Sequence, residues 1–371
     1  MTQSPPFMPG LPGIPTADQM IGQWNTAFQK VMAIPKVWDA VQKVRVGVTP
    51  SRPVYREDSL RLLRYESATA TKFDTPVLFV FALVNRPYIL DLREGKSVVH
   101  HFVRAGFPTY KIDWGKPGEG DRYLGLEDYV QVYMDNVVDE IRRQTGQDKV
   151  SIVGYCMGGT MSAMYTALHP EKVKNLILMA APVDWSTRDS LLCLWSDARY
   201  FDVDKLVEVY GNAPPHWLQT SFLWLRPVQN LLEKWVGFYD KMDDEKFLED
   251  FMAMETWLND NVPVAGETFR QFVKYCFQQN QLIQGKLEIG TERVNLKKIG
   301  CPILNLIAQQ DHLVTPSQSQ PFADAVSSTD RETVTFPGGH IGLAVGSKAH
   351  RDLWPRVVQW LEQRSEKATA R

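Results

Sequence analysis

Residues 149–170 read KVSIVGYCMGGTMSAMYTALHP, and this stretch decides the fold. It begins with apolar residues typical of a buried strand, passes through a glycine-rich turn around Cys156, and continues as a helical pattern. The turn fits G-x-S-x-G, a strand-to-helix turn that exposes a nucleophile, except that cysteine replaces serine. Gly154, Gly158 and Gly159 let such a turn close without clashes. A buried, inert cysteine in a glycine-rich turn is the alternative interpretation.

Strand and helix patterns alternate on both sides of this turn. Apolar or alternating runs predict strands at 59–67, 76–84, 108–114, 149–155, 173–185, 301–312 and 332–340. Helical patterns occupy 97–107, 126–146 and 160–169. Such alternation predicts right-handed crossovers and a mostly parallel sheet flanked by helices. Together with the turn around Cys156, it indicates an α/β-hydrolase fold, with a core at 54–185 and 291–371.

The alternation stops between residues 186 and 290, where the sequence is rich in helical patterns and aromatic residues. We expect this stretch to form a helical lid (cap) over the mouth of the sheet. Additional hydrophobic core is the alternative interpretation. The aromatic residues are Trp195, Tyr200, Phe201, Trp217, Phe222, Trp224, Trp235, Phe238, Tyr239, Phe247, Phe251 and Trp257.

Residues 1–53 form a separate N-terminal region. The prolines of residues 1–16 predict a flexible or extended arm, or else a docking arm for a partner. Apolar residues at helical spacing in 17–48 predict two amphipathic helices, broken at Pro35. Their apolar stripes need a surface to cover, either the core or another subunit.

A cysteine nucleophile needs a base, and the base needs a carboxylate that orients it; in this fold they follow in the order nucleophile, acid, histidine. Asp311 directly follows the apolar run ILNLIAQQ (303–310), and His340 lies in the glycine-rich stretch FPGGHIGL (336–343) at the end of the run at 332–340. We therefore expect a Cys156, Asp311 and His340 triad. Asp311 as a simple turn residue and His340 as an incidental loop histidine are the alternatives. His312, on the loop of Asp311, competes as the base, although a supporting polar role suits it better.

The oxyanion formed during acyl transfer needs backbone N–H donors. We expect the N–H of Met157, directly after the nucleophile, to be one of them. The second donor is expected in the loop after the strand at 76–84, where Val84 and Asn85 are the candidates. An ordinary strand-to-helix turn is the alternative interpretation of that loop.

Composition excludes several classes of protein. The formal net charge of −2, from 41 basic and 43 acidic residues, argues against a nucleic-acid binder. The four cysteines contain no C-x-x-C pair, which indicates a reducing compartment and no zinc site or disulfide framework. The longest apolar run, 76–84, is too short to span a membrane, and the N-terminus has no secretory pattern. We therefore expect a cytoplasmic chain without a transmembrane segment.

Sulfur at the nucleophile position favours one kind of chemistry. A thiol accepts an acyl group from a thioester with little change in free energy and keeps it activated. A lid would exclude water, the competing nucleophile. These features favour an acyltransferase that uses acyl-CoA over a hydrolase.

Several motifs, in order, resemble the catalytic subunit of polyhydroxyalkanoate synthase. They are GYCMGGT, VNRPYILDL, IDWGKP, DARYFDVDK, GNAPP, PVAGETFRQ and QQNQLIQGKLEI. The resemblance extends from about residue 50 to the C-terminus, lid included. The long N-terminal domain of class I and II synthases is missing, so the chain resembles class III or class IV.

The resemblance implies a function for the whole chain. It implies polymerisation of (R)-3-hydroxyacyl-CoA, with 3-hydroxybutyryl-CoA as the expected substrate, into a polyester. Cys156 would carry the growing chain, His340 would act as base, and Asp311 would assist, for instance by activating the incoming 3-hydroxyl. Coenzyme A is part of the substrate and a product, and we expect no metal or other cofactor.

The resemblance also implies partners and a location. Class III and IV catalytic subunits work with a second, non-catalytic subunit, of the PhaE or PhaR type. We therefore expect homo- and hetero-oligomers and association with cytoplasmic polyester granules.

Two other functions remain open at this point. A cysteine hydrolase of the dienelactone hydrolase kind shares the G-x-C-x-G-G turn, but those chains are shorter and lack the helical insertion. A non-catalytic granule-binding protein is the second, although the intact Cys156, Asp311 and His340 set argues against a decayed site.

Overall fold

The computed structural model describes residues 17–67 and 69–368, so the predicted arm at 1–16 lies outside the described residues. The chain forms two compact units. The larger consists of Arg45–Pro227 and Thr256–Arg371, and the smaller of Met1–Val44 and Val228–Glu255. The predicted lid range, 186–290, contributes to both units.

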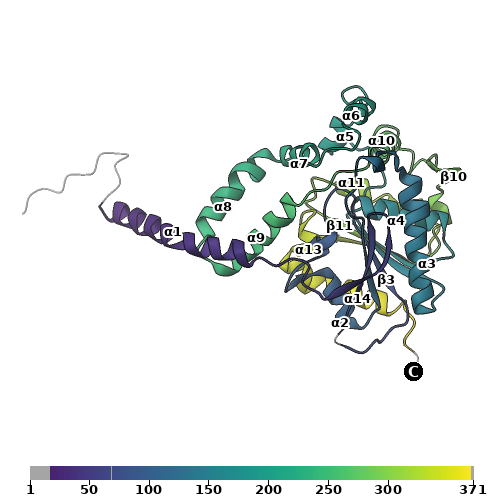
Figure 1. The fold of residues 1–371 in the computed structure, drawn as a ribbon, viewed down its shortest axis with the longest axis horizontal. Coiled ribbons are helices and arrows are strands. Elements are labelled where there is room, and N and C mark those ends of the chain that lie inside the picture. Colours follow the sequence, from purple (N-terminus) through teal and green to yellow (C-terminus); the bar gives the residue numbers. More distant parts are fainter. Residues whose placement is uncertain (1–16, 68, 369–371) are drawn as a thin grey trace, which may run out of the picture. The chain divides into compact units, whose positions relative to one another are not determined.

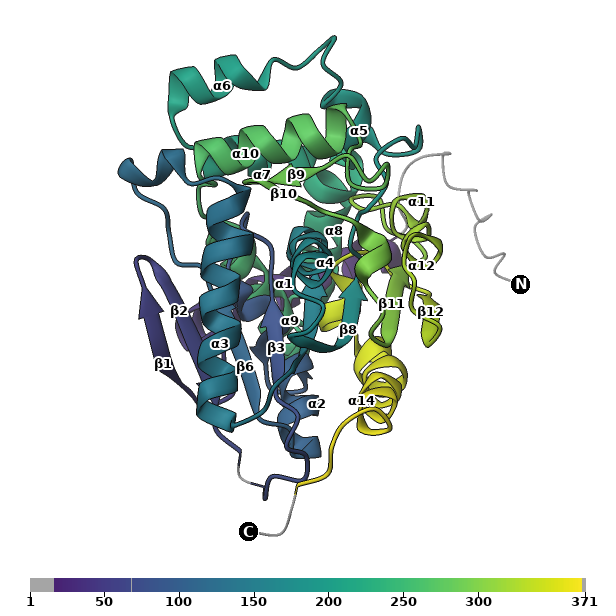
Figure 2. The same ribbon diagram turned by 90° about the vertical axis from the view of Figure 1, so that its right-hand side faces the viewer.

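The larger unit contains an eight-stranded sheet with the order β1-β2-β6-β3-β7-β8-β11-β12 (Figures 1 and 2). From β6 to β12 all neighbouring strands are parallel, and β1 and β2 add an antiparallel edge. The predicted, mostly parallel sheet is confirmed. Its strands are β1 (Ser51–Glu57), β2 (Leu60–Tyr65), β3 (Val77–Val80), β6 (Thr109–Asp113), β7 (Val150–Tyr155), β8 (Val173–Met179), β11 (Ile303–Ala308) and β12 (Arg331–Phe336).

Helices flank this sheet on both sides (Figure 1). On one side, α2 and α14 pack through Phe102 and Trp354, and Phe102 also meets Phe79 of β3 edge-to-face. Gly146 ends α3 in the left-handed conformation, as its place after the helical pattern predicts. The flanking helices are α2 (Val98–Ala105), η3 with α3 (Asp128–Tyr133 and Met134–Thr145), α4 (Met157–Leu168), and η7 with α14 (Ala349–Leu353 and Trp354–Glu362).

The strands β8 and β11 are connected by the insertion. Figure 2 shows α5, α6, α7 and α10 together at one end of the larger unit. Gly266 begins α10 where a Cβ atom would lie 2.0 Å from the carbonyl oxygen of Gly211, so glycine is required at this contact. The helices are α5 (Leu191–Trp195), α6 (Val203–Tyr210), α7 (Pro215–Trp224), α10 (Gly266–Gln271) and η5 (Phe272–Gln278).

Short elements complete the larger unit. They include η1 (Pro87–Leu90), β4 (Asp91–Arg93), β5 (Lys96–Ser97), η2 (Gly120–Tyr123), β9 (Glu288–Ile289), β10 (Glu292–Arg293), η6 (Leu296–Lys298), α11 (Pro316–Ser319), α12 (Phe322–Ala325) and α13 (Gly342–Val345).

The smaller unit combines α1 (Ala17–Lys43) with η4 (Val228–Glu233), α8 (Lys234–Lys241) and the first part of α9 (Glu245–Asn259). The expectation of two helices broken at Pro35 is wrong, because α1 continues through this residue. Ala33 and Val37, before and after the proline, pack against one cluster that contains Met242 and Leu248. Packing on both sides therefore holds the helix together despite the hydrogen bond that proline removes.

Lys30 ties α1 to the rest of the smaller unit. Its Nζ donates hydrogen bonds to the Asp240 carbonyl and to the Asp243 carboxylate, both at 2.7 Å. The side chain is only 11% exposed, so this ion pair is better shielded from water than a typical surface pair.

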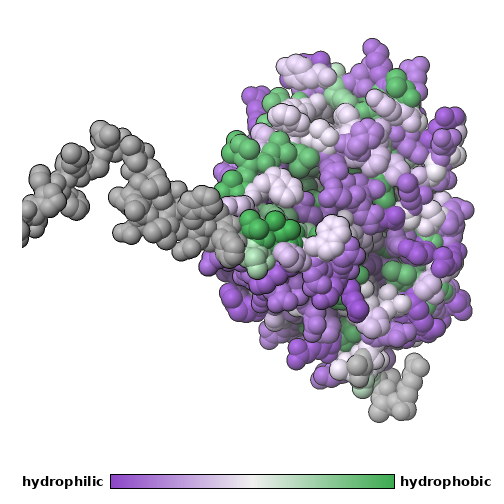
Figure 3. Space-filling model, turned by 60° about the vertical axis from the view of Figure 1, so that its left-hand side comes forward, coloured by the Kyte–Doolittle hydropathy of each residue, from purple (hydrophilic) through white to green (hydrophobic). Residues whose placement is uncertain are grey.

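Large hydrophobic side chains are exposed on the smaller unit. Figure 3 shows one face of the protein, on which hydrophobic residues, in green, gather in patches among hydrophilic ones. Trp38 is 68% exposed, although its helix is packed through Ala33. No helix among the described residues is long and apolar enough to span a bilayer. The exposed residues are Val31, Met32, Ile34, Trp38, Val41, Val228, Leu231, Leu232, Trp235, Val236 and Tyr239.

Candidate active site

Cys156 lies at the turn between β7 and α4, as the sequence predicts. Its φ of 56° and ψ of −130° are unusual for a residue with a side chain. Hydrogen bonds hold the turn: the Cys156 N–H donates to the Met179 carbonyl at 2.9 Å, and its carbonyl accepts from the Gly159 N–H at 2.9 Å. A strained backbone conformation that neighbouring contacts hold in place is typical of a functional position. The side chain remains partly exposed.

The three glycines around Cys156 are explained by close backbone contacts. A Cβ atom at Gly154 would lie 2.6 Å from the Cα atom of Gly159, and one at Gly159 would lie 2.5 Å from Ala181. A Cβ atom at Gly158 would lie 2.5 Å from the backbone of Phe81. The first turn of α4 therefore lies directly against the loop that follows β3.

Asp311 and His340 are brought together by the pairing of β11 and β12, which continues beyond the strands. The Gln309 N–H donates to the Phe336 carbonyl and the Gln310 N–H to the Gly338 carbonyl, both at 2.9 Å. Because β7, β8, β11 and β12 are parallel neighbours, their carboxyl ends bring the loops of Asp311 and His340 to the edge where Cys156 lies.

The predicted acid and base form a buried pair. His340 Nδ1 and Asp311 Oδ2 are 2.6 Å apart. The other carboxylate oxygen, Oδ1, accepts the N–H groups of Leu313 and Val314 at 2.9 Å each. The Asp311 side chain has no exposed surface, and that of His340 is 8% exposed. Because Nδ1 is engaged by the carboxylate, Nε2 is the ring nitrogen left to face Cys156.

The surroundings of His340 favour its protonated form. Burial lowers the pKa of His340, but the charges of Asp311 and Cys156, with hydrogen bonds to both side chains, outweigh it and raise the pKa well above its usual value. A proton taken from the Cys156 thiol would therefore be held on His340. The structure brings together all three side chains of the predicted triad.

Tyr155 is a site residue that sequence reasoning missed. Its ring stacks on the His340 ring, with centroids 5.0 Å apart, and its hydroxyl donates to the His340 carbonyl at 3.1 Å. Burial and the charges of Cys156 and Asp311 raise the pKa of Tyr155, so the phenol stays neutral. Its place directly before Cys156 was the available signal, but a tyrosine in a strand is usually a core residue.

His312 does not join the triad. It lies half-buried beside Asp311, and its Nδ1 is buried without a hydrogen-bond partner among the described residues. Burial, together with the charge of Arg226, lowers the pKa of His312. Its neighbours Leu313 and Val314 line the cavity described next, whereas His312 is not among the lining residues.

A cavity of about 280 Å³ opens at Cys156 and His340. Aromatic side chains of the insertion form much of its wall, together with Phe81 and Tyr155. Of the aromatic residues expected in a lid, Trp195, Phe201, Trp217, Phe222 and Trp257 line the cavity. Phe269, Phe272 and Phe277, which the sequence did not single out, line it too. Trp235, Phe238, Phe247 and Phe251 instead contact one another in the smaller unit.

The predicted oxyanion donors lie around the same cavity. Met157, Val84 and Asn85 all line it beside Cys156. The contact between Gly158 and Phe81 explains this placement, because it joins the start of α4 to the loop that carries Val84 and Asn85. Which N–H faces an oxyanion stays a prediction.

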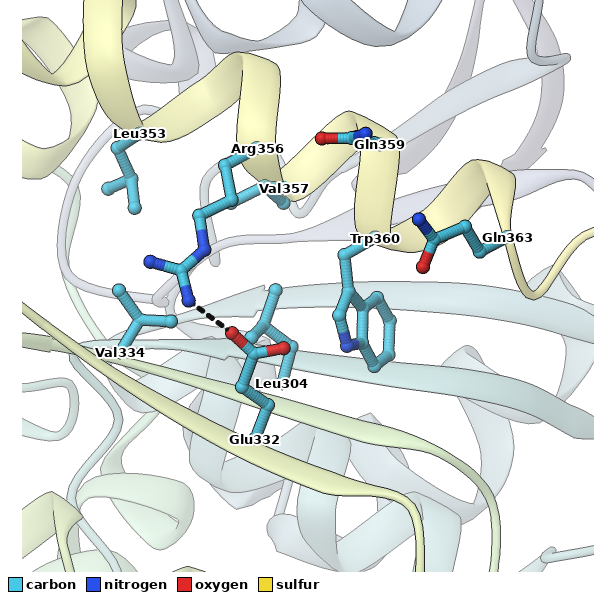
Figure 4. A pocket seen from close by; sticks show the side chains of 9 residues that line it. All are labelled: Leu304, Glu332, Val334, Leu353, Arg356, Val357, Gln359, Trp360 and Gln363. Carbon is cyan, nitrogen blue, oxygen red and sulfur yellow. Dashed lines mark hydrogen bonds and ion pairs between the residues drawn. The ribbon is translucent and has the colours of Figure 1, made fainter.

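A second hollow, of about 270 Å³, lies between α14 and the strands β11 and β12 (Figure 4). Arg356 of α14 pairs there with Glu332 of β12, beside Trp360. Its lining residues include no cysteine or histidine. Within residues 17–67 and 69–368, no group of three or more histidine, cysteine or acidic side chains could hold a metal ion.

Two family models match the chain. The α/β-hydrolase fold model matches residues 76–347, and the model of the N-terminus of poly-beta-hydroxybutyrate polymerase (PhaC) matches residues 40–102. The first model covers most of the chain and confirms the predicted fold.

Curated relatives are similar over most of their length. The poly(3-hydroxyalkanoate) polymerase subunit PhaC of Haloferax mediterranei is 45% identical, over 94% of this chain and 71% of the relative. The subunit of the same name from Allochromatium vinosum is 42% identical, over 87% of this chain and 91% of the relative. That of Synechocystis is 44% identical, over 86% of both chains.

Solved structures share the fold at low sequence identity. A putative lipase from Sulfolobus solfataricus has a TM-score of 0.52 and 16% identity, with 86% of this chain and 99% of that chain covered. Rv0554 from Mycobacterium tuberculosis has a TM-score of 0.51 and 15% identity, with 82% and 94% covered. At this identity the likeness concerns the fold alone.

Replacing Gly158 with alanine should disrupt the turn, because the new methyl group would meet the Phe81 backbone at 2.5 Å. We expect the free energy of unfolding to fall by about 1–3 kcal/mol, measured by urea denaturation. Gly237→Ala is the control, since Gly237 lies in α8 with no atom within 4 Å of the added carbon. That variant should be unchanged or more stable by up to about 1 kcal/mol. Equal stability of both variants would contradict the proposed close contact.

The raised pKa of His340 predicts a pH-dependent stability. A group with a raised folded pKa stabilises the folded chain fully below its unfolded pKa, here 6.5, and loses this effect as pH rises through the folded pKa. We therefore expect Asp311→Asn to lower the free energy of unfolding, relative to wild type, most near pH 6 and progressively less as the pH rises toward about 10, the folded pKa of His340. A pH-independent difference between them would exclude this electrostatic origin.

Proposed function

The chain belongs to the poly(3-hydroxyalkanoate) polymerase (PhaC) family and is a polyester-forming acyltransferase, and we propose that it works through an acyl group carried on Cys156. The observation that carries this proposal is the buried Asp311–His340 pair beside a partly exposed Cys156 at an apolar cavity. Such a set activates a thiol for attack on a thioester.

Acylation is the first step of the proposed reaction. His340 Nε2 takes the proton of the Cys156 thiol, and the thiolate attacks the carbonyl carbon of (R)-3-hydroxyacyl-CoA. The bond between that carbon and the coenzyme A sulfur then breaks, and the departing sulfur receives the proton from His340. The raised pKa of His340 supports its part as the intermediate holder of this proton.

An oxyanion forms on the substrate carbonyl during this step. We propose that the N–H of Met157 and one N–H of Val84 or Asn85 stabilise it. All three residues line the cavity at Cys156, which supports the assignment. Donors fixed in advance around a developing charge are usually the largest electrostatic contribution to such catalysis.

Chain growth is the second step. The 3-hydroxyl of one acyl unit loses its proton to His340 and attacks the thioester carbonyl of another unit. An ester forms as the bond between that carbonyl carbon and the sulfur breaks, and the departing sulfur takes the proton from His340 to become a thiol. The Asp311 side chain has no exposed surface, and its carboxylate binds His340 and two backbone N–H groups. These contacts support a role in which Asp311 acts by orienting His340. Direct activation of the hydroxyl by Asp311 is less well supported, because substrate cannot reach the buried side chain.

The cavity favours a hydroxyl of the substrate over water as the nucleophile. Its wall is largely aromatic and aliphatic, and the few polar lining residues include His340, Asn85 and Gln318. An acyl chain would bury apolar surface there, whereas ordered water finds few partners. We propose (R)-3-hydroxybutyryl-CoA as the substrate, with no metal or other cofactor taking part.

The decisive experiment measures release of coenzyme A from (R)-3-hydroxybutyryl-CoA by the purified chain, together with insoluble polyester in the same tubes. Wild type should release coenzyme A and form polymer, and Cys156→Ala should lose both by about 10³-fold or more, because the nucleophile is removed. Release of coenzyme A without polymer would indicate a hydrolase. If no coenzyme A were released, a non-catalytic granule-binding role would be favoured instead.

We further propose that the smaller unit binds a second, non-catalytic synthase subunit, of the PhaE or PhaR type, and lies at the granule surface. Its exposed hydrophobic side chains on α1, η4 and α8 support this proposal. Isolated exposed hydrophobic residues are common on soluble proteins, but a concentration of them on one small unit is typical of an interaction surface.

Trp38→Glu should weaken binding to a purified candidate second subunit, because a buried charge would replace an aromatic contact. We expect the dissociation constant to rise about tenfold or more, measured by calorimetry. Tyr123→Glu is the matched control, because Tyr123 is an aromatic residue of the larger unit with 72% exposure, and it should bind as wild type does. Unchanged binding by Trp38→Glu would remove α1 from the interface.

A further inference from the structure

The loop between β3 and η1 carries Val84 and Asn85, and contacts fix it at both ends. At its start, the Trp114 Nε1–H donates to the Phe81 carbonyl at 2.9 Å. At its end, the Trp257 Nε1–H donates to the Arg86 carbonyl at 2.8 Å. Both indole side chains are buried, with 6% of their surface exposed. An irregular segment is thus held by one buried and one partly buried hydrogen bond.

Residues 257–261 make further contacts with the same end of the loop. Asn261 forms an antiparallel β-bridge with Asn85, one of the two candidate donors. The Asp260 carboxylate accepts a hydrogen bond from the Arg86 Nε–H at 3.4 Å and one from the Tyr88 hydroxyl at 3.1 Å. Burial raises the pKa of Tyr88, and the Asp260 charge raises it further, so the hydroxyl remains a donor.

The segment at 257–261 is itself held in place. The Asn261 Nδ2 group donates to the Leu258 carbonyl at 2.7 Å and to Gln219 Oε1 of α7 at 2.8 Å. Gln219 Nε2 donates in turn to the Leu258 carbonyl at 2.8 Å. The segment therefore offers the loop a fixed surface.

We propose that Asp260 and Trp257 are positioning residues that hold the backbone of Val84 and Asn85 at the oxyanion. This inference rests on the proposed function, because it assumes that one of these N–H groups is a donor. Catalytic groups act fully only when held within about 0.5 Å of the productive geometry by further contacts. Asp260 holds the side chains of Arg86 and Tyr88, and Trp257 holds the carbonyl of Arg86.

The same segment also forms part of the cavity wall. Trp257 and Leu258 line the cavity together with Val84 and Asn85. An acyl chain in the cavity would therefore contact the residues that hold the donor. Asp260 itself lies outside the lining, so its replacement tests positioning separately from acyl binding.

Two reactions of Cys156 distinguish loss of oxyanion-donor positioning from a general disturbance of the site. Iodoacetamide alkylates the thiolate by displacing iodide at a saturated carbon, and no oxyanion forms. A 4-nitrophenyl ester acylates the same thiolate through a tetrahedral oxyanion and releases 4-nitrophenolate. The ester carries no coenzyme A, so this comparison holds even if the protein does not use (R)-3-hydroxybutyryl-CoA.

Asp260→Asn removes the charge that holds Arg86, and Trp257→Phe removes the indole donor but keeps an aromatic ring. We expect the acylation rate constant to fall about tenfold or more in each variant, since loss of an oxyanion donor costs about 10²–10³-fold. The alkylation rate should stay within about twofold of wild type. With (R)-3-hydroxybutyryl-CoA, Asp260→Asn should lower kcat and change KM little, because Asp260 lies outside the cavity lining.

Two controls accompany these variants. Asp324→Asn changes an exposed carboxylate on α12 and should react as wild type in both assays. Trp217→Phe changes another tryptophan of the cavity wall, which stacks on Phe201, and should change KM more than kcat.

Equal loss of acylation and alkylation in Asp260→Asn would indicate a structural role and overturn the proposal, as would unchanged acylation. Coenzyme A release that survives in Cys156→Ala would overturn the proposed function instead.

Discussion

The backbone around Cys156 leaves no room for a single additional methyl group. The first turn of α4 lies against β7 on one side and the loop after β3 on the other, and glycines at 154, 158 and 159 make both contacts close. The close contact between these backbone segments fixes the orientation of the Cys156 thiol and places the loop after β3 beside it. The candidate oxyanion donors are placed beside Cys156 by that contact. Asp311 and His340 are placed by the pairing of β11 with β12.

Burial of the Asp311 carboxylate is a second constraint. An ionised carboxylate without exposed surface is costly unless its oxygens are bound. Here the turn at 311–314 supplies two N–H donors, and His340 supplies the third contact. The bond between Asp311 Oδ2 and His340 Nδ1 also holds the imidazole in one orientation. Tyr155 holds the other side of the ring, so His340 is constrained by a hydrogen bond at its edge and an aromatic ring on its face.

Much of the site could be predicted because its signals are local. Cys156, Asp311 and His340 each follow a strand pattern, and the parallel order of those strands brings their ends together. Tyr155 was missed because its partner is the carbonyl of a residue 185 positions away. The helix break predicted at Pro35 was wrong for a similar reason, because the contacts that keep α1 continuous come from Met242 and Leu248, far along the chain. The aromatic residues of the insertion could not be divided between cavity wall and smaller unit, because helical spacing does not reveal which neighbour a face meets.

The lining of the cavity is drawn from almost the whole length of the larger unit, from Phe81 to Ile341. Domains of nascent chains fold as units while synthesis proceeds from the N-terminus. Cys156 would leave the ribosome long before His340 and the last strand do. The thiol therefore lies beside neither His340 nor a complete cavity wall until residues up to Ile341 have been synthesised. On the proposed mechanism, a shorter nascent chain would not capture acyl groups.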